Sequence, residues 1–167
     1  MTERIDEIDA RILAFLQQSG RMKRNAIAEE VSLSVPSVSE RMRKLEERGV
    51  ITGYHAVLDA KRLHYDITAF IRVMVDGSGH YPDFVERVMT LPEVLEVHSI
   101  TGEGSHILKI RTRNTTTLER LLSILQAIPG VHGTSTSIVL STYKETREVQ
   151  VRPMELFQYE DQTAEPV

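Results

Sequence analysis

The strongest constraint on the fold is a pattern of apolar residues and one proline that occurs twice, 37 positions apart. Each copy predicts a helix that leads through a Leu/Ile-Pro-x-Val turn into a strand. The paired positions are Phe84, Val85, Val88, Leu91, Pro92 and Val94, followed by Leu121, Leu122, Leu125, Ile128, Pro129 and Val131. A β-branched run precedes each helix, at 67–75 and 107–112. The order strand, helix, strand, strand, helix, strand predicts a ferredoxin-like βαββαβ domain with an antiparallel sheet.

The first predicted strand of this domain carries apolar residues on both of its faces. One face holds alternating residues, which are Ile67, Ala69, Ile71, Val73 and Val75. Phe70 and Met74 lie on the opposite face. Because helices cover one side of such a sheet, we expect a second copy of the chain to cover the other. The sequence therefore predicts a homodimer at least.

The helical period appears three times ahead of this repeat. The apolar positions are Ile5, Ile8, Ile12, Phe15 and Leu16, then Ile27, Ala28 and Val31, then Val35, Val38, Met42 and Leu45. Ser34 is a good N-cap, Pro36 fits a first turn, and Gly20 and Gly49 end their helices. Three helices with a tight polar turn predict a helix-turn-helix domain, followed by a strand over 50–58. The expected class is α+β, with domains at 1–58 and 67–147, a hinge linker at 59–66 and an acidic tail at 148–167.

Composition excludes several classes of function. The 167 residues include no cysteine, which removes disulfides, thiolate zinc sites and cysteine nucleophiles. We find no apolar run of ~18 residues and no apolar core behind the charged N-terminus, so we expect no membrane association, no signal peptide and a cytoplasmic protein. The net charge is −4, but residues 20–49 hold seven Lys/Arg against five Asp/Glu. The basic excess is therefore local.

The third predicted helix has the two faces that a DNA-reading helix needs. Its outer stripe contains Ser37, Arg41, Lys44 and Arg48, with Glu40 beside it. We predict a base contact for Arg41, a base or phosphate contact for Ser37, and phosphate contacts for Lys44 and Arg48. Glu40 would accept from a cytosine amino group or repel wrong registers. Arg21, Lys23 and Arg24, which precede the second helix, would grip the flanking backbone. The alternative is a solvated surface helix, and the helix-turn-helix context favours double-stranded DNA.

Motifs spread over residues 5 to about 144 resemble the Lrp/AsnC family of bacterial and archaeal transcription regulators, also called feast/famine proteins. The motifs are Ile5-Asp6-x-x-Asp9-x-x-Ile12-Leu13, Ser34-x-x-x-Val38-x-x-Arg41-Met42-x-x-Leu45-Glu46-x-x-Gly49-Val50-Ile51-x-Gly53-Tyr54, Thr101-Gly102 and Lys144. The resemblance implies a winged or extended helix-turn-helix, that is, a winged-helix-like DNA-binding domain, joined by a hinge to a ferredoxin-like module that binds a small-molecule effector and dimerises. It also implies that dimers assemble to octamers and that an amino acid bound between modules alters assembly and DNA binding.

The resemblance places the effector pocket at the loop between the second and third sheet strands. The family usually reads Gly-Asp-x-Asp there, whereas this chain lacks the second acid, which leaves Glu103 as the one local carboxylate. The implied pocket residues are Thr101, Gly102, Glu103, Gly104, Ser105 and His106, with Thr134 and Thr136 from a neighbouring module. Ordinary strand threonines are the alternative for the last two. His64 stands where the family often has glycine.

Other chemistries have weaker support in the residues. Six histidines are present, but none is paired at the i, i+4 spacing of a helical metal site, so we expect no metal and no cofactor. We expect no catalysis. One rival is a sirohaem-decarboxylase-like enzyme, because such proteins resemble this family in their two-domain plan. Another is a nucleoid-architectural protein that contacts mainly phosphates. The sequence favours a sequence-specific transcriptional regulator that responds to a small molecule.

Overall fold

The computed structural model describes residues 4–155 and divides the chain into two compact units. Of the described residues, the helical unit comprises 4–57 together with 146–155, and the sheet unit comprises Leu58–Glu145. The helical unit is therefore built from two stretches of chain that are far apart in the sequence. No helix within residues 4–155 is long and apolar enough to cross a membrane.

The helical unit contains the predicted helix-turn-helix. Its elements are β1 (Arg4–Ile5), α1 (Glu7–Gln18), α2 (Arg24–Val31), α3 (Val35–Glu47) and β6 (Met154–Glu155). Asp6 caps α1 by accepting from the N–H of Asp9, and Ser34 caps α3 by accepting from the N–H of Ser37. Ser32 ends α2 in the left-handed conformation with a φ of 56°. Local hydrogen bonding thus sets the helix boundaries near those that the sequence predicts.

Two apolar clusters hold the three helices together. Ile12, Ile27 and Val38 are fully buried in one cluster, so each helix contributes a side chain to it. The second cluster joins Ile5 of β1 and Leu45 of α3 to Ala10 and Leu13 of α1. Burial of one such aliphatic side chain contributes about 1.5–3 kcal/mol to the free energy of unfolding. This packing fixes the inner face of α3 and leaves its other face to solvent.

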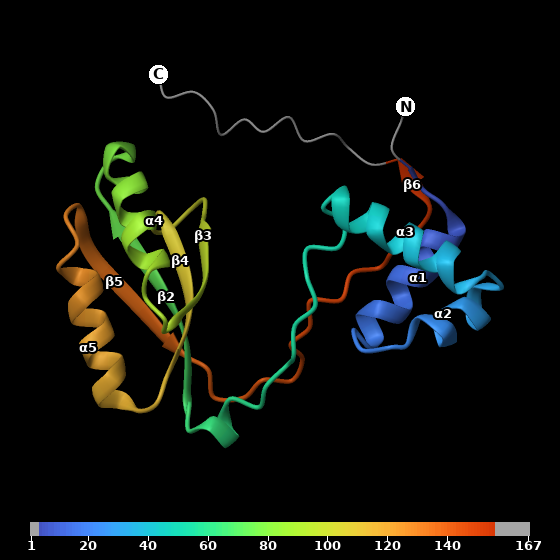
Figure 1. Ribbon diagram of the computed structural model, residues 1–167. Helices are drawn as coiled ribbons and strands as arrows, with labels where there is room; N and C mark the ends of the chain where they lie inside the picture. The colour runs from blue at the N-terminus through green and yellow to red at the C-terminus, as the bar shows by residue number, and fades with distance from the viewer. Residues whose placement is uncertain (1–3, 156–167) are drawn as a thin grey trace. The chain divides into compact units, whose positions relative to one another are not determined.

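The sheet unit has the predicted ferredoxin-like topology (Figure 1). Its elements are the 3-10 turns η1 (Lys61–Leu63) and η2 (Ser78–His80), the strands β2 (Ile67–Val75), β3 (Val94–Ser99), β4 (His106–Thr112) and β5 (Val131–Ile138), and the helices α4 (Tyr81–Met89) and α5 (Thr115–Gln126). The strand order is β3-β4-β2-β5, and every pair is antiparallel. Both helices cover the same face, so the α+β prediction is confirmed.

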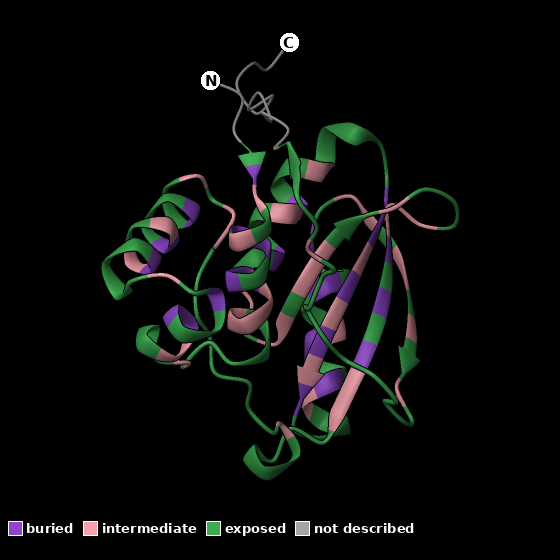
Figure 2. Ribbon diagram, turned by 90° about the vertical axis from the view of Figure 1, so that its right-hand side faces the viewer, coloured by how far each residue is buried: buried purple, intermediate pink, exposed green. Residues whose placement is uncertain are grey.

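The core of the sheet unit lies between this sheet and its two helices. Buried and more exposed residues alternate along the strands (Figure 2). Ile71, Leu108, Phe84 and Leu125 are fully buried, one each from β2, β4, α4 and α5. The opposite face, which we call the open face, carries Phe70 with 39% of its surface exposed.

The structure differs from the sequence prediction in two connecting segments. Residues 50–58 form no strand, and within residues 4–155 no neighbouring strand pairs with them. The expected linker over 59–66 contains η1, and His64 ends it in the left-handed conformation with a φ of 61°.

The C-terminal segment also departs from the expected tail. Residues 146–155 fold with the helical unit, and β6 pairs antiparallel with β1. The remainder of the predicted acidic tail, 156–167, lies outside the described residues. The sheet unit spans Leu58–Glu145, so it begins one residue before the expected linker at 59 and ends two residues before the expected domain end at 147.

Candidate functional site

The outer face of α3 is exposed and borders an open hollow on the helical unit. We define this face by the residues that the sequence predicts, which are Ser37, Glu40, Arg41, Lys44 and Arg48. All five line the hollow, together with Arg4 and Asp6. Val38, Met42 and Leu45 are buried behind them. The helical period therefore separates an anchoring face from a face that a duplex can approach.

Arg41 is the most constrained cation on this face. Its Nη1 lies 2.6 Å from Oδ2 of Asp6 and 2.8 Å from Oδ1 of Asp9. These two carboxylates also form the capping box of α1. One guanidinium thus ties the middle of α3 to the start of α1. Both bonds use Nη1, so the guanidinium that is predicted to contact guanine is already engaged inside the protein.

We call the contacts of Arg41 with Asp6 and Asp9 the clamp. The clamp stabilises the charged forms of Asp6 and Arg41. Burial alone would raise the pKa of Asp6, yet that pKa lies below 3.8, because the N–H of Asp9 and the guanidinium of Arg41 bind the ionised carboxylate. The pKa of Arg41 is raised despite burial, because both carboxylates accept hydrogen bonds from it. Asp6 and Arg41 are therefore both ionised at neutral pH.

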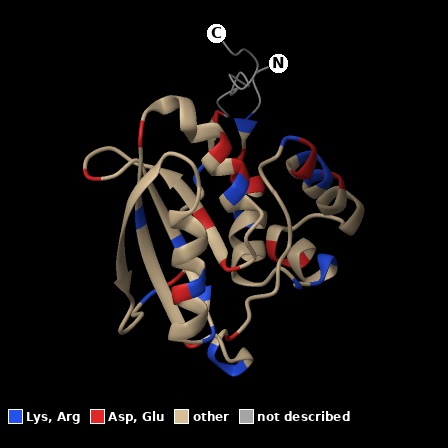
Figure 3. Cartoon of the chain, turned by 90° about the vertical axis from the view of Figure 1, so that its left-hand side faces the viewer, with Lys and Arg blue, Asp and Glu red and all other residues tan. Residues whose placement is uncertain are grey.

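The neighbouring cations are partly neutralised by acids on the same helix. Glu40 accepts from Arg43 at 2.9 and 2.6 Å and lies 3.7 Å from Nζ of Lys44. The hydrogen bond from Arg43 is the main reason why the pKa of Glu40 is lowered. Acidic and basic residues are intermixed along the helices of this unit (Figure 3). Glu40 therefore holds Lys44 along the helix and weakens its pull on a phosphate.

Arg4 is a cation at this hollow that the sequence analysis missed. Its backbone oxygen accepts a hydrogen bond from Nη1 of Arg48 at 3.4 Å, and its side chain is exposed. Its position directly before the first helix was the available clue. Arg4 and Arg48 together place two cations beside the C-terminal end of α3.

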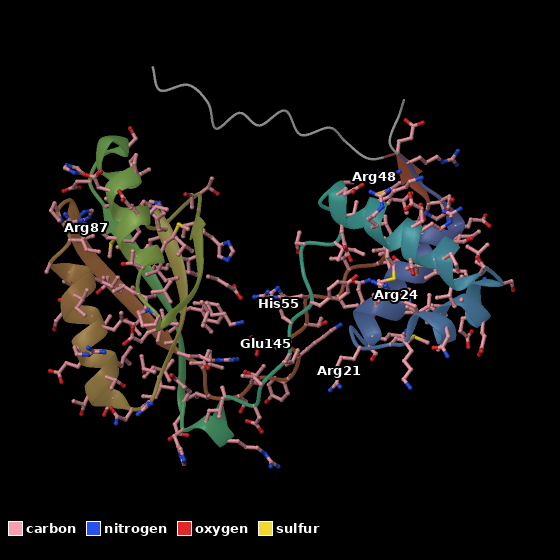
Figure 4. The ribbon with its side chains drawn as sticks, in the orientation of Figure 1. Arg21, Arg24, Arg48, His55, Arg87 and Glu145 are labelled. Atoms are coloured by element: carbon pink, nitrogen blue, oxygen red, sulfur yellow. The ribbon has the colours of Figure 1, made fainter. Side chains whose placement is uncertain are left out.

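The three flanking cations of the sequence prediction lie elsewhere. Figure 4 shows Arg21 and Arg24 near the turn between α1 and α2, away from Arg48 at the end of α3. Lys23 is the N-cap residue of α2, and its side chain makes no capping bond. All three are exposed, and none lines the hollow. They remain candidates for contacts with flanking backbone.

The predicted effector loop joins β3 to β4. Thr101, Gly102 and Glu103 are exposed, so the Glu103 carboxylate is available to a ligand. Gly104 has a φ of +88°, and a Cβ at this position would lie 3.3 Å from the backbone oxygen of Val73. A glycine is therefore required where the loop passes over β2.

Ser105 and His106 point into the sheet unit. The hydroxyl of Ser105 lies 3.1 Å from the oxygen of Val73, accepts from the N–H of Val75 at 3.2 Å and lies 2.9 Å from Nδ1 of His106. The His106 ring is 1% exposed and packs against Tyr81 and Phe84, with ring centroids 4.8 and 4.9 Å apart. These two residues therefore brace the base of the loop through contacts within the sheet unit.

His106 is also electrostatically unusual. Its Nε2 is buried without a hydrogen-bond partner in the described part of the chain. Burial lowers the pKa of His106 below 6.5, so the ring is neutral at pH 7.

Thr134 and Thr136 lie on β5, which is an edge strand of the sheet. They pair with Val73 and Ile71, and the hydroxyl of Thr134 accepts from Nε2 of Gln126 on α5 at 3.0 Å. Cross-strand partners share a face, so both threonines lie on the helix-covered face. Strand β2 separates β5 from β4 and its loop by about 10 Å. Within one subunit the two predicted parts of the pocket are therefore separate.

Across residues 4–155, no three His, Asp or Glu side chains come together in a way that could hold a metal ion. Instead, His98 contacts Glu96 at 3.3 Å, and His132 contacts Asp76 at 3.1 Å.

Comparison with known proteins identifies both units. Residues 68–149 match the Lrp/AsnC ligand binding domain, and residues 5–52 match a winged helix-turn-helix DNA-binding domain. The HTH-type transcriptional regulator FL11 of Pyrococcus horikoshii is 39% identical over 148 residues, which cover 89% of this chain and 97% of the relative.

Solved structures agree with this sequence match. A transcriptional regulator of Neisseria meningitidis, in complex with L-methionine, aligns with a TM-score of 0.82 and 30% identity over 86% of this chain and 95% of that chain. The feast or famine regulatory protein of M. tuberculosis, also complexed with L-methionine, aligns with a TM-score of 0.82 and 29% identity. This alignment covers 88% of this chain and 99% of that chain. The chain belongs to the Lrp/AsnC family of DNA-binding transcriptional regulators.

Proposed function

We propose that the protein is a homodimeric, sequence-specific transcriptional regulator that reads duplex DNA with α3 and responds to an amino acid at the β3–β4 loop. The observation that carries the proposal is the outer face of α3, which exposes Ser37 and Lys44 while Val38 and Met42 anchor the helix from behind. Two such helices in a dimer would enter successive major grooves about 34 Å apart.

The DNA-binding part is tested by the ratio of affinities for a fragment upstream of the protein's own gene and for random DNA, at fixed salt. A specific regulator gives a ratio of roughly 10³ or more. A ratio near one contradicts sequence-specific reading and favours a nucleoid-architectural role. Lys61 lies on η1 in the sheet unit, so Lys61→Ala is the control for variants that remove a cation from α3.

The open face of the sheet supports dimerisation. Phe70 is exposed there, while Lys109 and Arg111 are paired with Glu145, and Lys109 also with Glu96. Phe70, with these neutralised charges beside it, suits contact with a second copy of the same face. Phe70→Glu should shift the protein towards monomers in light scattering. Ile124→Glu, on the exposed side of α5, is the matched control. Octamers, as the family resemblance implies, would need further contacts between dimers.

The β3–β4 loop supports binding of an amino acid. Glu103 is exposed at its tip and could receive an ammonium group, while loop N–H groups could receive a carboxylate. The two methionine complexes of related structures support this class of effector. A thermal-shift screen of the twenty amino acids, combined with measurement of particle size, tests binding and assembly together. Glu103→Ala should lose the shift and Glu119→Ala should keep it. An unchanged shift in Glu103→Ala would place the ligand elsewhere.

This function involves no catalysed reaction, and relatives such as FL11 are named as transcriptional regulators. It requires the protein to share a compartment with the chromosome, which is the cytoplasm in bacteria and archaea. Stoichiometric binding of sirohaem with a shifted absorption band would instead favour the decarboxylase alternative.

A further inference from the structure

The segment 146–155, which we call the strap, returns to the helical unit after the chain has completed the sheet unit. The match to the ligand binding domain ends at residue 149, so β6 lies beyond it. Three contacts attach the strap. Val149 pairs with the Gln17 side chain, Val151 packs on the cluster of Ile5 and Leu45, and β6 pairs with β1.

The strap is matched in length to α1. The side chain of Gln17, in the last turn of α1, donates to the oxygen of Val149 at 2.9 Å and accepts from its N–H at 2.8 Å. Met154 pairs with Ile5, just before the first turn. The twelve residues of α1 rise about 18 Å, and the five steps from Val149 to Met154 cover about 17 Å in an extended chain. The strap therefore runs along α1 from its end back to its start.

Through β1, the strap is also connected to three residues that line the hollow beside α3, which are Arg4, Asp6 and Arg48. Ile5 is 2% exposed and packs with Leu45 of α3. The oxygen of its neighbour Arg4 accepts from Arg48. Asp6, the next residue, caps α1 and binds Arg41. Residues before a first helix are poorly ordered unless something ties them down, and β6 is the element that pairs with β1.

We infer that the strap is a positioning element for DNA binding, which holds Arg4, Arg48 and Asp6 in place beside α3. The inference rests on the proposed DNA-binding function. Without the strap, Ile5 loses a packing partner and β1 loses its ladder, so the cations at the C-terminal end of α3 become mobile. A duplex then has to order them at the cost of affinity.

The first test uses full-length variants and the upstream fragment. Val151→Asp should weaken DNA binding about tenfold, whereas Val151→Ile should bind as the parent does. Gln17→Ala should weaken it less, and Gln18→Ala, on the adjacent exposed residue, should leave it unchanged. The slope of log affinity against log salt should also fall by about one to two units in Val151→Asp, because Arg4 and Arg48 lose their places near phosphates. A mere loss of folded protein would leave that slope unchanged.

The second test compares shortened chains 1–155 and 1–145. The chain 1–155 should bind DNA as the full chain does, and 1–145 should show the same defect as Val151→Asp. Full affinity and slope in both 1–145 and Val151→Asp would overturn the role of the strap. If the unsubstituted full chain does not bind the DNA fragment, the proposed function is contradicted instead. If 1–145 does not fold, the salt slopes of Val151→Asp and Gln17→Ala decide.

Discussion

The two predicted sites of this protein differ in where their polar side chains point. On α3, Ser37, Lys44 and Arg48 lie on the face that the helical period assigns to solvent. At the β3–β4 loop, Ser105 and His106 turn inwards and hydrogen-bond within the sheet unit. A helix fixes the direction of every side chain through its period, whereas a loop leaves direction to contacts that are distant in sequence. Spacing therefore identifies a helical binding face more reliably than a loop pocket.

Arg41 is the exception on the helix, because its side chain binds Asp6 and Asp9 within the protein. Its removal should lower the free energy of unfolding more than the other substitutions do. Arg41→Ala leaves the Asp9 carboxylate without its cation, and the Asp9 side chain is only 10% exposed. We expect the free energy of unfolding to fall by about 2–3 kcal/mol, less than for a fully buried pair because Asp6 is half exposed. Urea unfolding measures the change. Arg43→Ala, which breaks exposed pairs, should lower the free energy of unfolding much less. Equally small losses of unfolding free energy in both variants would contradict a stabilising role of the contacts of Arg41 with Asp6 and Asp9.

Ser105→Ala tests whether the loop residue is structural. The substitution leaves the N–H of Val75 and Nδ1 of His106 without their hydroxyl partner. We expect a loss of about 1–2 kcal/mol in the free energy of unfolding. Ser99→Ala, at an exposed position of β3, is the control. An effect on ligand binding without a loss of stability would show that the hydroxyl faces the ligand.

The two units should also lose stability in different pH ranges as the pH falls. The pKa of His106 is lowered by burial, so its contribution to stability is complete above about pH 6.5 and is lost as the pH falls towards its folded value. The pKa of Asp6 is lowered from 3.8, so its contribution is lost only below about pH 4.

Urea unfolding between about pH 7.5 and pH 5.5 therefore reports on His106. The loss should not exceed about 1.4 kcal/mol per pH unit. His106→Gln should flatten the profile, and His98→Gln, on the exposed part of β3, should not. A steep profile in His106→Gln would assign the acid sensitivity to another group.

Lys44→Ala should have the smallest effect. Glu40 already holds this ammonium group at 3.7 Å, so its loss should weaken DNA binding only a few-fold. The slope of log affinity against log salt should fall by about one unit if Lys44 contacts a phosphate. An unchanged slope would remove Lys44 from the interface.

Features that depend on local sequence were predictable. The N-caps Asp6 and Ser34, the buried face of α3 and the repeated helix–turn–strand all follow from spacing within a few residues. The ferredoxin-like topology followed from the order of these elements.

Features that depend on distant partners were not predictable. Arg41 meets Asp6 and Asp9, which are more than thirty residues away in the sequence. The segment 50–58 is rich in strand-forming residues but has no ladder partner among residues 4–155, and Val57 is 99% exposed. The strap is held by one half-buried valine and by backbone hydrogen bonds, which leave little trace in an apolar pattern.

The division of the helical unit between two stretches of chain has a consequence for biosynthesis. A ribosome releases residues in order, and domains commonly fold as they emerge. Here α1, α2 and α3 can assemble early, but β1 has to wait until the whole of Leu58–Glu145 and then β6 have followed. The first unit to be translated is thus the last to be completed, and a nascent chain finishes its ligand-binding half before its DNA-binding half.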